Sequence, residues 1–125
     1  MEKILNYING ELVEPTSGNY LDNYNPSNGQ VYSLIPDSEE LDINKAVLAA
    51  KEAFKTWSKK PKQERSDILM KLADTIEKYS DELIKAESKD NGKPESLAAH
   101  VDIPRAPANI RFFAGAILHD SSKMH

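Results

Sequence analysis

The sequence predicts an α/β chain in which the strands come first and the helices follow. Short extended runs separated by turn residues occupy positions 1–36, and from Ser38 onward apolar residues recur at intervals of three and four. The length of 125 residues is sufficient to bury the core of one small domain. We therefore expect an N-terminal β-hairpin or meander followed by four amphipathic helices.

The predicted strands are defined by the turns between them. Asn9 and Gly10 stand between the apolar runs LNYI and ELV, and an Asn-Gly pair in this setting is the strongest short signal for a hairpin. We expect this hairpin near residues 4–14. The turn residues PSNG separate the extended runs 20–24 and 30–35, which predicts a second hairpin or meander.

Three of the predicted helices follow one another closely. The first begins at the acidic segment SEELD and ends before Pro61, because proline cannot continue a helix. The second covers about 62–79, with its apolar side chains on one stripe. Ser80 is expected to cap the third helix, and Asn91-Gly92 to end it in a left-handed conformation.

The last predicted helix contains two prolines. Pro104 and Pro107 lack the N–H that a helix interior requires, so the helix is expected to begin at 103–104 with Asp102 or Ile103 as its cap. Its apolar face then consists of Ile110, Phe112, Phe113, Ile117 and Leu118.

The composition argues against several classes of protein. A formal net charge of -4 argues against a nucleic-acid partner. No run approaches the roughly 18 to 20 apolar residues of a membrane span, and the N-terminus lacks a signal-peptide pattern, so we expect a cytoplasmic protein without a membrane partner. The chain has no cysteine, which excludes disulfides, thiolate metal sites and a cysteine nucleophile within it.

The predicted elements do not form a closed architecture. The strands are few and all N-terminal, whereas helical stripes need a sheet or further helices to cover them. On these grounds two alternatives remain: an incomplete piece of a larger α/β domain, or a small helical bundle with an appended hairpin. Because the apolar stripes need a partner surface, we expect the isolated chain to self-associate. The side chains concerned are Trp57, Phe112, Phe113, Ile117 and Leu118.

Six short motifs occur in an informative order within residues 4–119. They are YINGELV, NPSNGQV, AVLAAKEAFKTW, ERSDILMKLADTIEKYSDEL, ESKDNGKP and RFFAG. In this succession the chain resembles the N-terminal segment of the aldehyde dehydrogenase superfamily. The segments DIPRA and NIRFFAGAILH resemble most the branch that acts on 2-aminomuconic and 2-hydroxymuconic semialdehydes.

The resemblance implies a larger enzyme than this chain. Such an enzyme has a Rossmann-like NAD(P)-binding domain, a catalytic domain with a cysteine nucleophile, and oligomerisation strands. Residues 1–125 would form the N-terminal part of the cofactor domain, with strands and turns in 1–36 and helices in 38–120. We therefore expect NAD in the parent enzyme, no cofactor on this chain alone, and no activity of this chain alone.

Arg105 is the candidate substrate-binding residue. Near a helix start its charge opposes the helix dipole, at a cost of a few tenths to about 1 kcal/mol, and surface pairing with Asp102 is one interpretation. The resemblance implies a second one, in which the paired donors of the guanidinium bind the carboxylate of a semialdehyde substrate. Pro107 stands where the resemblance leads us to expect an aliphatic residue.

Asp90 has two interpretations, as a polar residue at a helix C-terminus or as a cation ligand. The resemblance implies a monovalent cation held by Asp90 and by backbone carbonyls near Asn23 and Tyr24. Lys93 and Pro94 are expected to be structural, ending one helix and starting the next. The histidines show neither metal-ligand spacing nor a nucleophile–base pattern and are expected on the surface: His100, His119 and His125.

Two hypotheses for the function follow. In the first, the chain is part of an enzyme that oxidises an aldehyde to the acid with NAD. The expected aldehyde is a carboxylated semialdehyde, and the partner of this chain is the rest of the aldehyde dehydrogenase polypeptide or a homologue. In the second, the chain is a stand-alone, non-catalytic interaction or regulatory module that docks on a full-length homologue.

Overall fold

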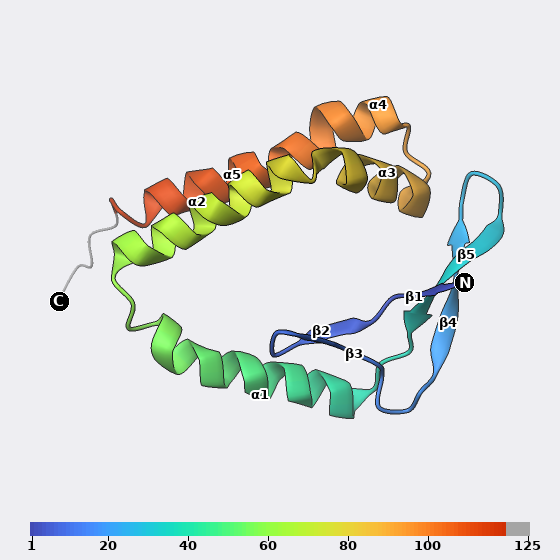
Figure 1. Ribbon diagram of the computed structural model, residues 1–125, viewed down its shortest axis with the longest axis horizontal. Helices are drawn as coiled ribbons and strands as arrows, with labels where there is room; N and C mark the ends of the chain where they lie inside the picture. Colours follow the sequence, from blue (N-terminus) through green and yellow to red (C-terminus); the bar gives the residue numbers. More distant parts are fainter. Residues whose placement is uncertain (120–125) are drawn as a thin grey trace. The chain divides into compact units, whose positions relative to one another are not determined.

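A computed structural model describes residues 1–119 (Figure 1). The chain divides into two compact units, Met1–Lys59 and a second one that begins at Lys60, and each is described by itself. Within the described residues the first unit contains five strands and one helix, and the second is helical. The predicted order, strands before helices, is confirmed.

The first hairpin consists of β2 (Asn6–Ile8) and β3 (Glu11–Val13), which pair antiparallel. Asn9 and Gly10 connect the strands with φ angles of 54° and 81°. A two-residue turn whose twist matches the strands needs positive φ at both positions, which Asn and Gly tolerate best. The predicted hairpin is thus confirmed together with the reason for its turn.

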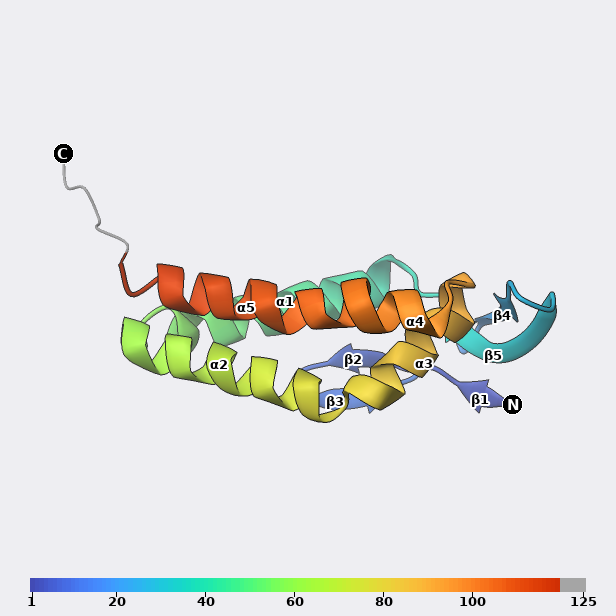
Figure 2. The same ribbon diagram turned by 90° about the horizontal axis from the view of Figure 1, so that it is seen from above.

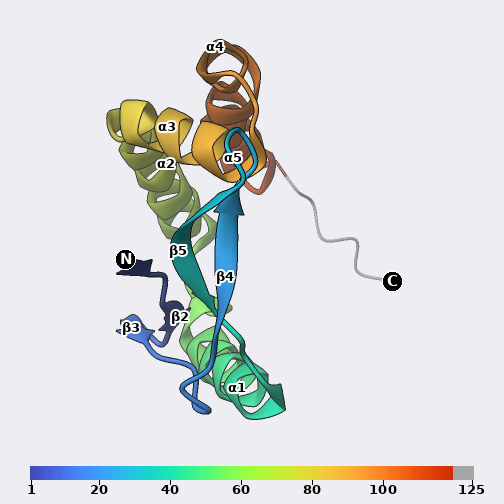
Figure 3. The ribbon, with the colours of Figure 1, turned by 90° about the vertical axis from the view of Figure 1, so that its right-hand side faces the viewer.

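The remaining strands of the first unit form a three-stranded sheet. It contains β1 (Glu2–Lys3), β4 (Tyr20–Asn25) and β5 (Gln30–Pro36) in the order β1-β5-β4. The strands β4 and β5 form the second predicted hairpin (Figure 3), and β1 pairs with β5 in parallel. The register between β4 and β5 shifts between Asn23 and Tyr24.

The helix α1 (Glu40–Trp57) follows the sheet, and Asp42 fixes its start. Asp42 Oδ1 accepts hydrogen bonds from the N–H and the hydroxyl of Thr16 at 2.9 and 2.6 Å, and Oδ2 accepts one from the N–H of Glu39 at 2.9 Å. These bonds, the Thr16 hydroxyl foremost, hold the pKa of the buried Asp42 below its usual range. The loop after β3 is thereby tied to the first turn of α1.

The second unit is built from three helical segments among the residues that the structure describes, the last of which contains three elements. Helices α2 and α5 lie side by side along much of their length, as Figures 1 and 2 both show. The segments are α2 (Lys62–Lys78), α3 (Ser80–Asn91), and a continuous run of α4 (Glu95–Leu97), the π-helical turn η1 (Ala98–Asp102) and α5 (Ile103–Ala116).

Small residues make the close contact between these helices possible. Ala73, Ala98 and Ala114 are fully buried, and the hydroxyl of Ser66 on α2 donates a buried hydrogen bond of 2.7 Å to the carbonyl of Ala114 on α5. Side chains without bulk let the backbones approach, so that a side chain on one helix reaches the backbone of the other.

One predicted helix cap is wrong, and one predicted helix start is confirmed. Ser80 is the first residue of α3 and Tyr79 its N-cap, so Ser80 does not cap the helix. The last predicted helix, α5, begins at Ile103 with Asp102 at its N-cap, as expected, but α4 and η1 precede it without a break. Asp102 has helical φ and ψ angles of -69° and -51°, and its side chain makes no capping hydrogen bond.

The π-helical turn explains how the last helix continues through the prolines. The N–H of Ile103 donates to the carbonyl of Ala98, five residues back rather than four, so the hydrogen-bonding register changes just before Pro104. Proline in a helix normally breaks that register because it has no N–H. Pro107 is buried inside α5. The sequence predicted the start of α5 but not the helical residues α4 and η1 that precede it.

The expected exposure of apolar side chains is confirmed for three of the five residues. Phe112, Phe113 and Leu118 are exposed, and the two phenyl rings meet edge to face with centroids 5.3 Å apart. Trp57 and Ile117 are half-buried. Among residues 1–119, no helix combines the length and apolar character needed to cross a membrane.

Candidate substrate-recognition site

The loop between α3 and α4 begins at Gly92. This residue closes α3 in the left-handed conformation with φ 79°, which confirms the predicted end of the helix. Glycine is preferred at this position because it has no Cβ to clash. The chain therefore turns sharply here and delivers Lys93 and Pro94 to the start of the next helical run.

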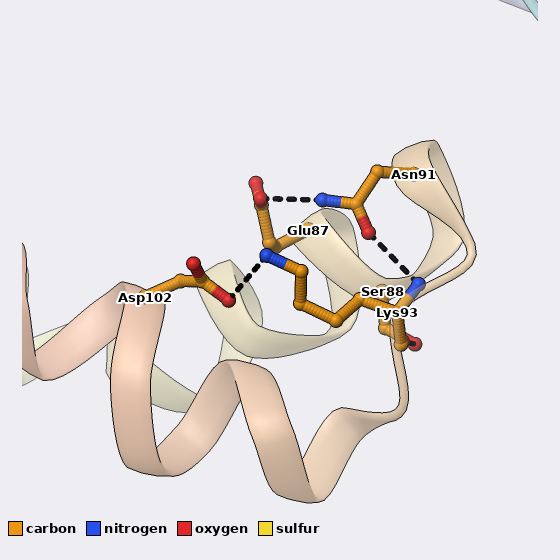
Figure 4. A network of polar contacts seen from close by, with 5 residues as sticks. All are labelled: Glu87, Ser88, Asn91, Lys93 and Asp102. Atoms are coloured by element: carbon orange, nitrogen blue, oxygen red, sulfur yellow. Dashed lines mark hydrogen bonds and ion pairs between the residues drawn. The ribbon is translucent and has the colours of Figure 1, made fainter.

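Lys93 is held in place through its backbone (Figure 4). Its N–H donates to Asn91 Oδ1 at 2.8 Å, and its carbonyl accepts from the hydroxyl of Ser88 at 2.5 Å. The amide of Asn91 in turn donates to Glu87 Oε1 at 2.6 Å. The backbone contacts alone thus fix the position of Lys93, independently of its side chain.

The side chain of Lys93 reaches Asp102 at the end of the π-helical turn. Lys93 Nζ donates to Asp102 Oδ2 at 2.9 Å, and the two side chains are only 31% and 28% exposed. Solvent and salt screen such a half-buried pair less than a pair on the open surface. The contact ties the loop after α3 to the helical run that carries Arg105 (Figure 4).

Arg105 lies on α5, three residues after Asp102, and is exposed. Within residues 1–119 its side chain has neither a hydrogen bond nor an ion pair, and Asp102, the surface partner that the sequence suggested, pairs with Lys93 instead. Since the helical run starts at Glu95, Arg105 is also not in a first turn, and the expected opposition to the helix dipole does not apply.

Arg111 on the same helix has the opposite environment. Its Nη2 lies 2.8 Å from Asp74 Oδ1, and its Nη1 donates to Glu77 Oε1; both carboxylates are on α2. The contact with Glu77 is the main reason why the pKa of Arg111 is raised and that of Glu77 lowered. Arg111 could not be identified from the sequence, because its partners are 34 and 37 residues away and no local pattern connects them.

A small cleft lies beside the start of α5. It has a volume of about 160 Å³, and its walls are mainly apolar. The only charged group in its lining, Glu77, is already paired with Arg111. The cleft therefore offers room for an apolar group but no free acid or base. Its lining consists of Ile76, Glu77, Ser80, Ile103, Pro104 and Pro107.

The residues of the predicted cation site lie in different units. Asn23 and Tyr24 are neighbours on β4, and the amide of Asn23 donates to the hydroxyls of Tyr32 and Ser33, each at 3.0 Å. Asp90 is an exposed residue near the end of α3. The cation site therefore stays a prediction. Among the described residues no group of three or more histidine, aspartate or glutamate side chains is placed to hold a metal ion.

The chain's own residues do not fit a dinucleotide-binding turn or a covalent catalytic centre. Its five glycines are each at least eight positions from the next, whereas the phosphate-binding turn requires glycines two and three positions apart. There is no cysteine. His100 and His119 are exposed as expected, and His125 lies outside the described residues.

Comparisons with known proteins give a consistent result. The family model described as the aldehyde dehydrogenase family matches residues 12–125. The 2-aminomuconic semialdehyde dehydrogenase of Bos taurus is 49% identical over 118 residues, which cover 94% of this chain and 24% of that protein. The 2-hydroxymuconic semialdehyde dehydrogenase of Pseudomonas sp. (strain CF600) is 43% identical, with 91% of this chain and 24% of that protein covered.

The same result is found among solved structures. The NAD+ complex of an aldehyde dehydrogenase from Bacillus cereus matches with a TM-score of 0.88 at 39% identity, covering 91% of this chain and 24% of that one. The chain thus spans about a quarter, 24%, of the length of the relatives it matches.

Proposed function

Because this chain belongs to the aldehyde dehydrogenase family, we propose that it forms the N-terminal part of the NAD(P)-binding domain of a cytoplasmic enzyme that oxidises an aldehyde to the acid with NAD. The resemblance predicted from the six motifs is confirmed, including the similarity to semialdehyde dehydrogenases. In the parent enzyme NAD supplies the hydride acceptor. The residues of this chain contribute to the scaffold and to substrate recognition.

The substrate that we propose is a carboxylated semialdehyde, bound at its carboxylate by Arg105. The observation that carries this proposal is that Arg105 is exposed and without an ion pair among residues 1–119, although a carboxylate lies three residues away. A guanidinium offers two parallel N–H donors, which match the two oxygens of a carboxylate. The similarity to the 2-aminomuconic and 2-hydroxymuconic enzymes supports the same substrate class.

A chimeric enzyme tests the role of Arg105. In it, this chain replaces the matching segment of the Bos taurus 2-aminomuconic semialdehyde dehydrogenase. Arg105→Ala is expected to lower kcat/KM about ten- to a hundredfold for the carboxylated semialdehyde, with little change for an uncarboxylated aldehyde of similar length. Arg105→Lys keeps the charge but loses the paired donors, so its kcat/KM for the carboxylated semialdehyde should lie between those of wild type and Arg105→Ala. An equal change for both substrates would contradict the proposal.

The isolated chain is expected to be inactive. Covalent catalysis in this family's reaction needs a nucleophile and a bound cofactor, and the chain has no cysteine and no closely spaced glycines. The measurement is aldehyde-dependent NAD reduction by the purified chain. Activity that follows the chain through every purification step would contradict this expectation.

The exposed phenyl rings favour a second candidate function, an interaction module that docks on a full-length homologue. Phe112 and Phe113 are 69% and 60% exposed. Apolar side chains of this size contribute most to the free energy of binding when a partner covers them. The isolated chain should self-associate or bind a hydrophobic dye. A single monomeric species in sedimentation experiments, without dye binding, would contradict this expectation.

A further inference from the structure

Asp102 is the nearest potential competitor of a substrate for Arg105. The two residues are three positions apart in a helical stretch, since Asp102 and Ile103 both have helical φ and ψ angles. Side chains at this spacing lie on the same side of a helix, and opposite charges there form ion pairs. A pair between Asp102 and Arg105 would occupy the donors that a substrate carboxylate needs.

The structure shows Asp102 engaged elsewhere. Lys93 Nζ lies 2.9 Å from Asp102 Oδ2, and both side chains are half-buried. The backbone of Lys93 is fixed on both sides by Asn91 and Ser88, so pairing with Asp102 has to order only the lysine side chain and not the loop as well. Figure 4 shows the lysine side chain extending from this fixed loop toward Asp102.

We propose that Lys93 is a positioning residue for substrate recognition: by pairing with Asp102 it leaves the guanidinium of Arg105 available for the carboxylate of the substrate. This inference rests on the proposed function. It gives the NGKP segment a part in specificity in addition to its structural role of ending α3 and starting the next helical run. Gly92 and Asn91 serve this role indirectly, because they set the position of Lys93.

Loss of Lys93 should change the KM of the carboxylated substrate by a limited factor. Without the lysine, Asp102 competes with the substrate for Arg105 through a surface pair of ordinary strength. Such pairs change an equilibrium about two- to fivefold. The KM of the carboxylated semialdehyde should therefore rise about two- to fivefold relative to that of the uncarboxylated aldehyde, while the kcat ratio for the two substrates stays the same.

The experiment uses the chimeric enzyme with Lys93→Met, which keeps the length of the side chain and removes its charge. The quantity compared is the KM ratio, the KM of the carboxylated semialdehyde divided by that of the uncarboxylated aldehyde. The double variant K93M/D102N should bring this ratio back to the wild-type value, because it also removes the competing carboxylate. Lys93→Arg should behave like wild type. Lys85→Met on α3, an exposed lysine of the same unit, is the control for loss of one positive charge and should leave the KM ratio unchanged.

Several outcomes would overturn the proposal. An unchanged KM ratio in K93M, or a raised ratio that D102N does not restore, would show that Lys93 acts otherwise, for instance by contacting the substrate itself. The proposed function fails separately, if Arg105→Ala leaves the preference for the carboxylated substrate intact. A crystal structure of this chain with K93M gives a readout without activity: Arg105 should form an ion pair with Asp102, and continued separation of the two would refute the inference.

Discussion

Arg105 and Arg111 are two arginines on one helix with different surroundings. Arg111 contacts two carboxylates on α2, Asp74 and Glu77, whereas Arg105 has no ion pair within the described residues and is exposed. The chemistry of the side chain is the same in both cases. The difference shows that the neighbours decide whether a guanidinium contributes ion pairs to the fold.

The two ends of α5 differ in packing as well as in charge. Near Arg111 the helix is tightly packed, with Ala114 fully buried and its carbonyl hydrogen-bonded to Ser66. Near Arg105 the start of α5 borders a mainly apolar cleft, and the loop after α3 contacts it through the ion pair of Lys93 and Asp102. The two ends therefore differ in what lies beside them: the packed helix α2 at the first, a cleft and a loop at the second.

The largest effect on stability is expected at the packed end. Ala114→Leu adds three carbon atoms at a position with no exposed surface, so α2 and α5 must separate or strain, at a cost of about 1 to 3 kcal/mol. Urea unfolding of the chain measures this. Ala116→Leu, at an exposed position of the same helix, is the control and should change the free energy of unfolding little. Equal changes in both variants would mean that the burial of Ala114 does not limit the size of the side chain at this position.

A smaller effect is expected from Ser66→Ala, which removes the buried hydrogen bond of 2.7 Å to the carbonyl of Ala114. The loss should be about 1 kcal/mol in the free energy of unfolding. Ser96→Ala, at an exposed position of the same unit, provides the comparison. If the two serine variants unfold at the same urea concentration, the hydrogen bond between α2 and α5 does not contribute.

The smallest effect is a pH dependence linked to Arg111. The hydrogen bond from Arg111 lowers the pKa of Glu77 in the folded chain, so unfolding takes up a proton as the pH falls below the ordinary glutamate pKa of about 4.3. The stabilisation by this pair is complete above that pH and is lost as the pH falls through the lower, folded pKa. Arg111→Met should therefore differ from wild type most at neutral pH, and the difference should shrink in acid.

Arg105→Met is the matched control for this pH dependence, because Arg105 has no carboxylate partner among the described residues. Its free energy of unfolding should differ from wild type by the same small amount at every pH. Thermal unfolding between pH 3 and pH 7 provides the data. A difference that shrinks in acid for Arg105 and not for Arg111 would reverse the assignment of the two residues.

Local signals in the sequence predicted the turns and most helix boundaries. Asn9-Gly10 and Gly92 need positive φ, and the structure has it at all three residues. These features succeed because residues next to each other determine them. The start of α5 at Ile103 was predicted as well. The π-helical turn at Ala98–Asp102, which joins α4 to α5, was not, because no rule based on single residues anticipates a change of hydrogen-bonding register.

The site was predictable only in part for a related reason. Arg105 could be selected from its segment DIPRA and the family resemblance, but the role that we propose for Lys93 involves a residue twelve positions earlier in another segment. The carboxylates that pair with Arg111 lie even farther away, on α2. Contacts between distant segments are a property of the folded chain, and here they distinguish the two arginines.

The most direct test of this distinction measures two properties of Arg105→Met and Arg111→Met side by side. The properties are the melting temperature of the chain and, in the chimeric enzyme, the ratio of kcat/KM for carboxylated over uncarboxylated aldehyde. We expect Arg105→Met to lower the ratio about ten- to a hundredfold without changing the melting temperature, and Arg111→Met to lower the melting temperature without changing the ratio. If both variants lower the melting temperature and leave the ratio unchanged, Arg105 is a structural residue, and its proposed role in binding the substrate carboxylate is wrong.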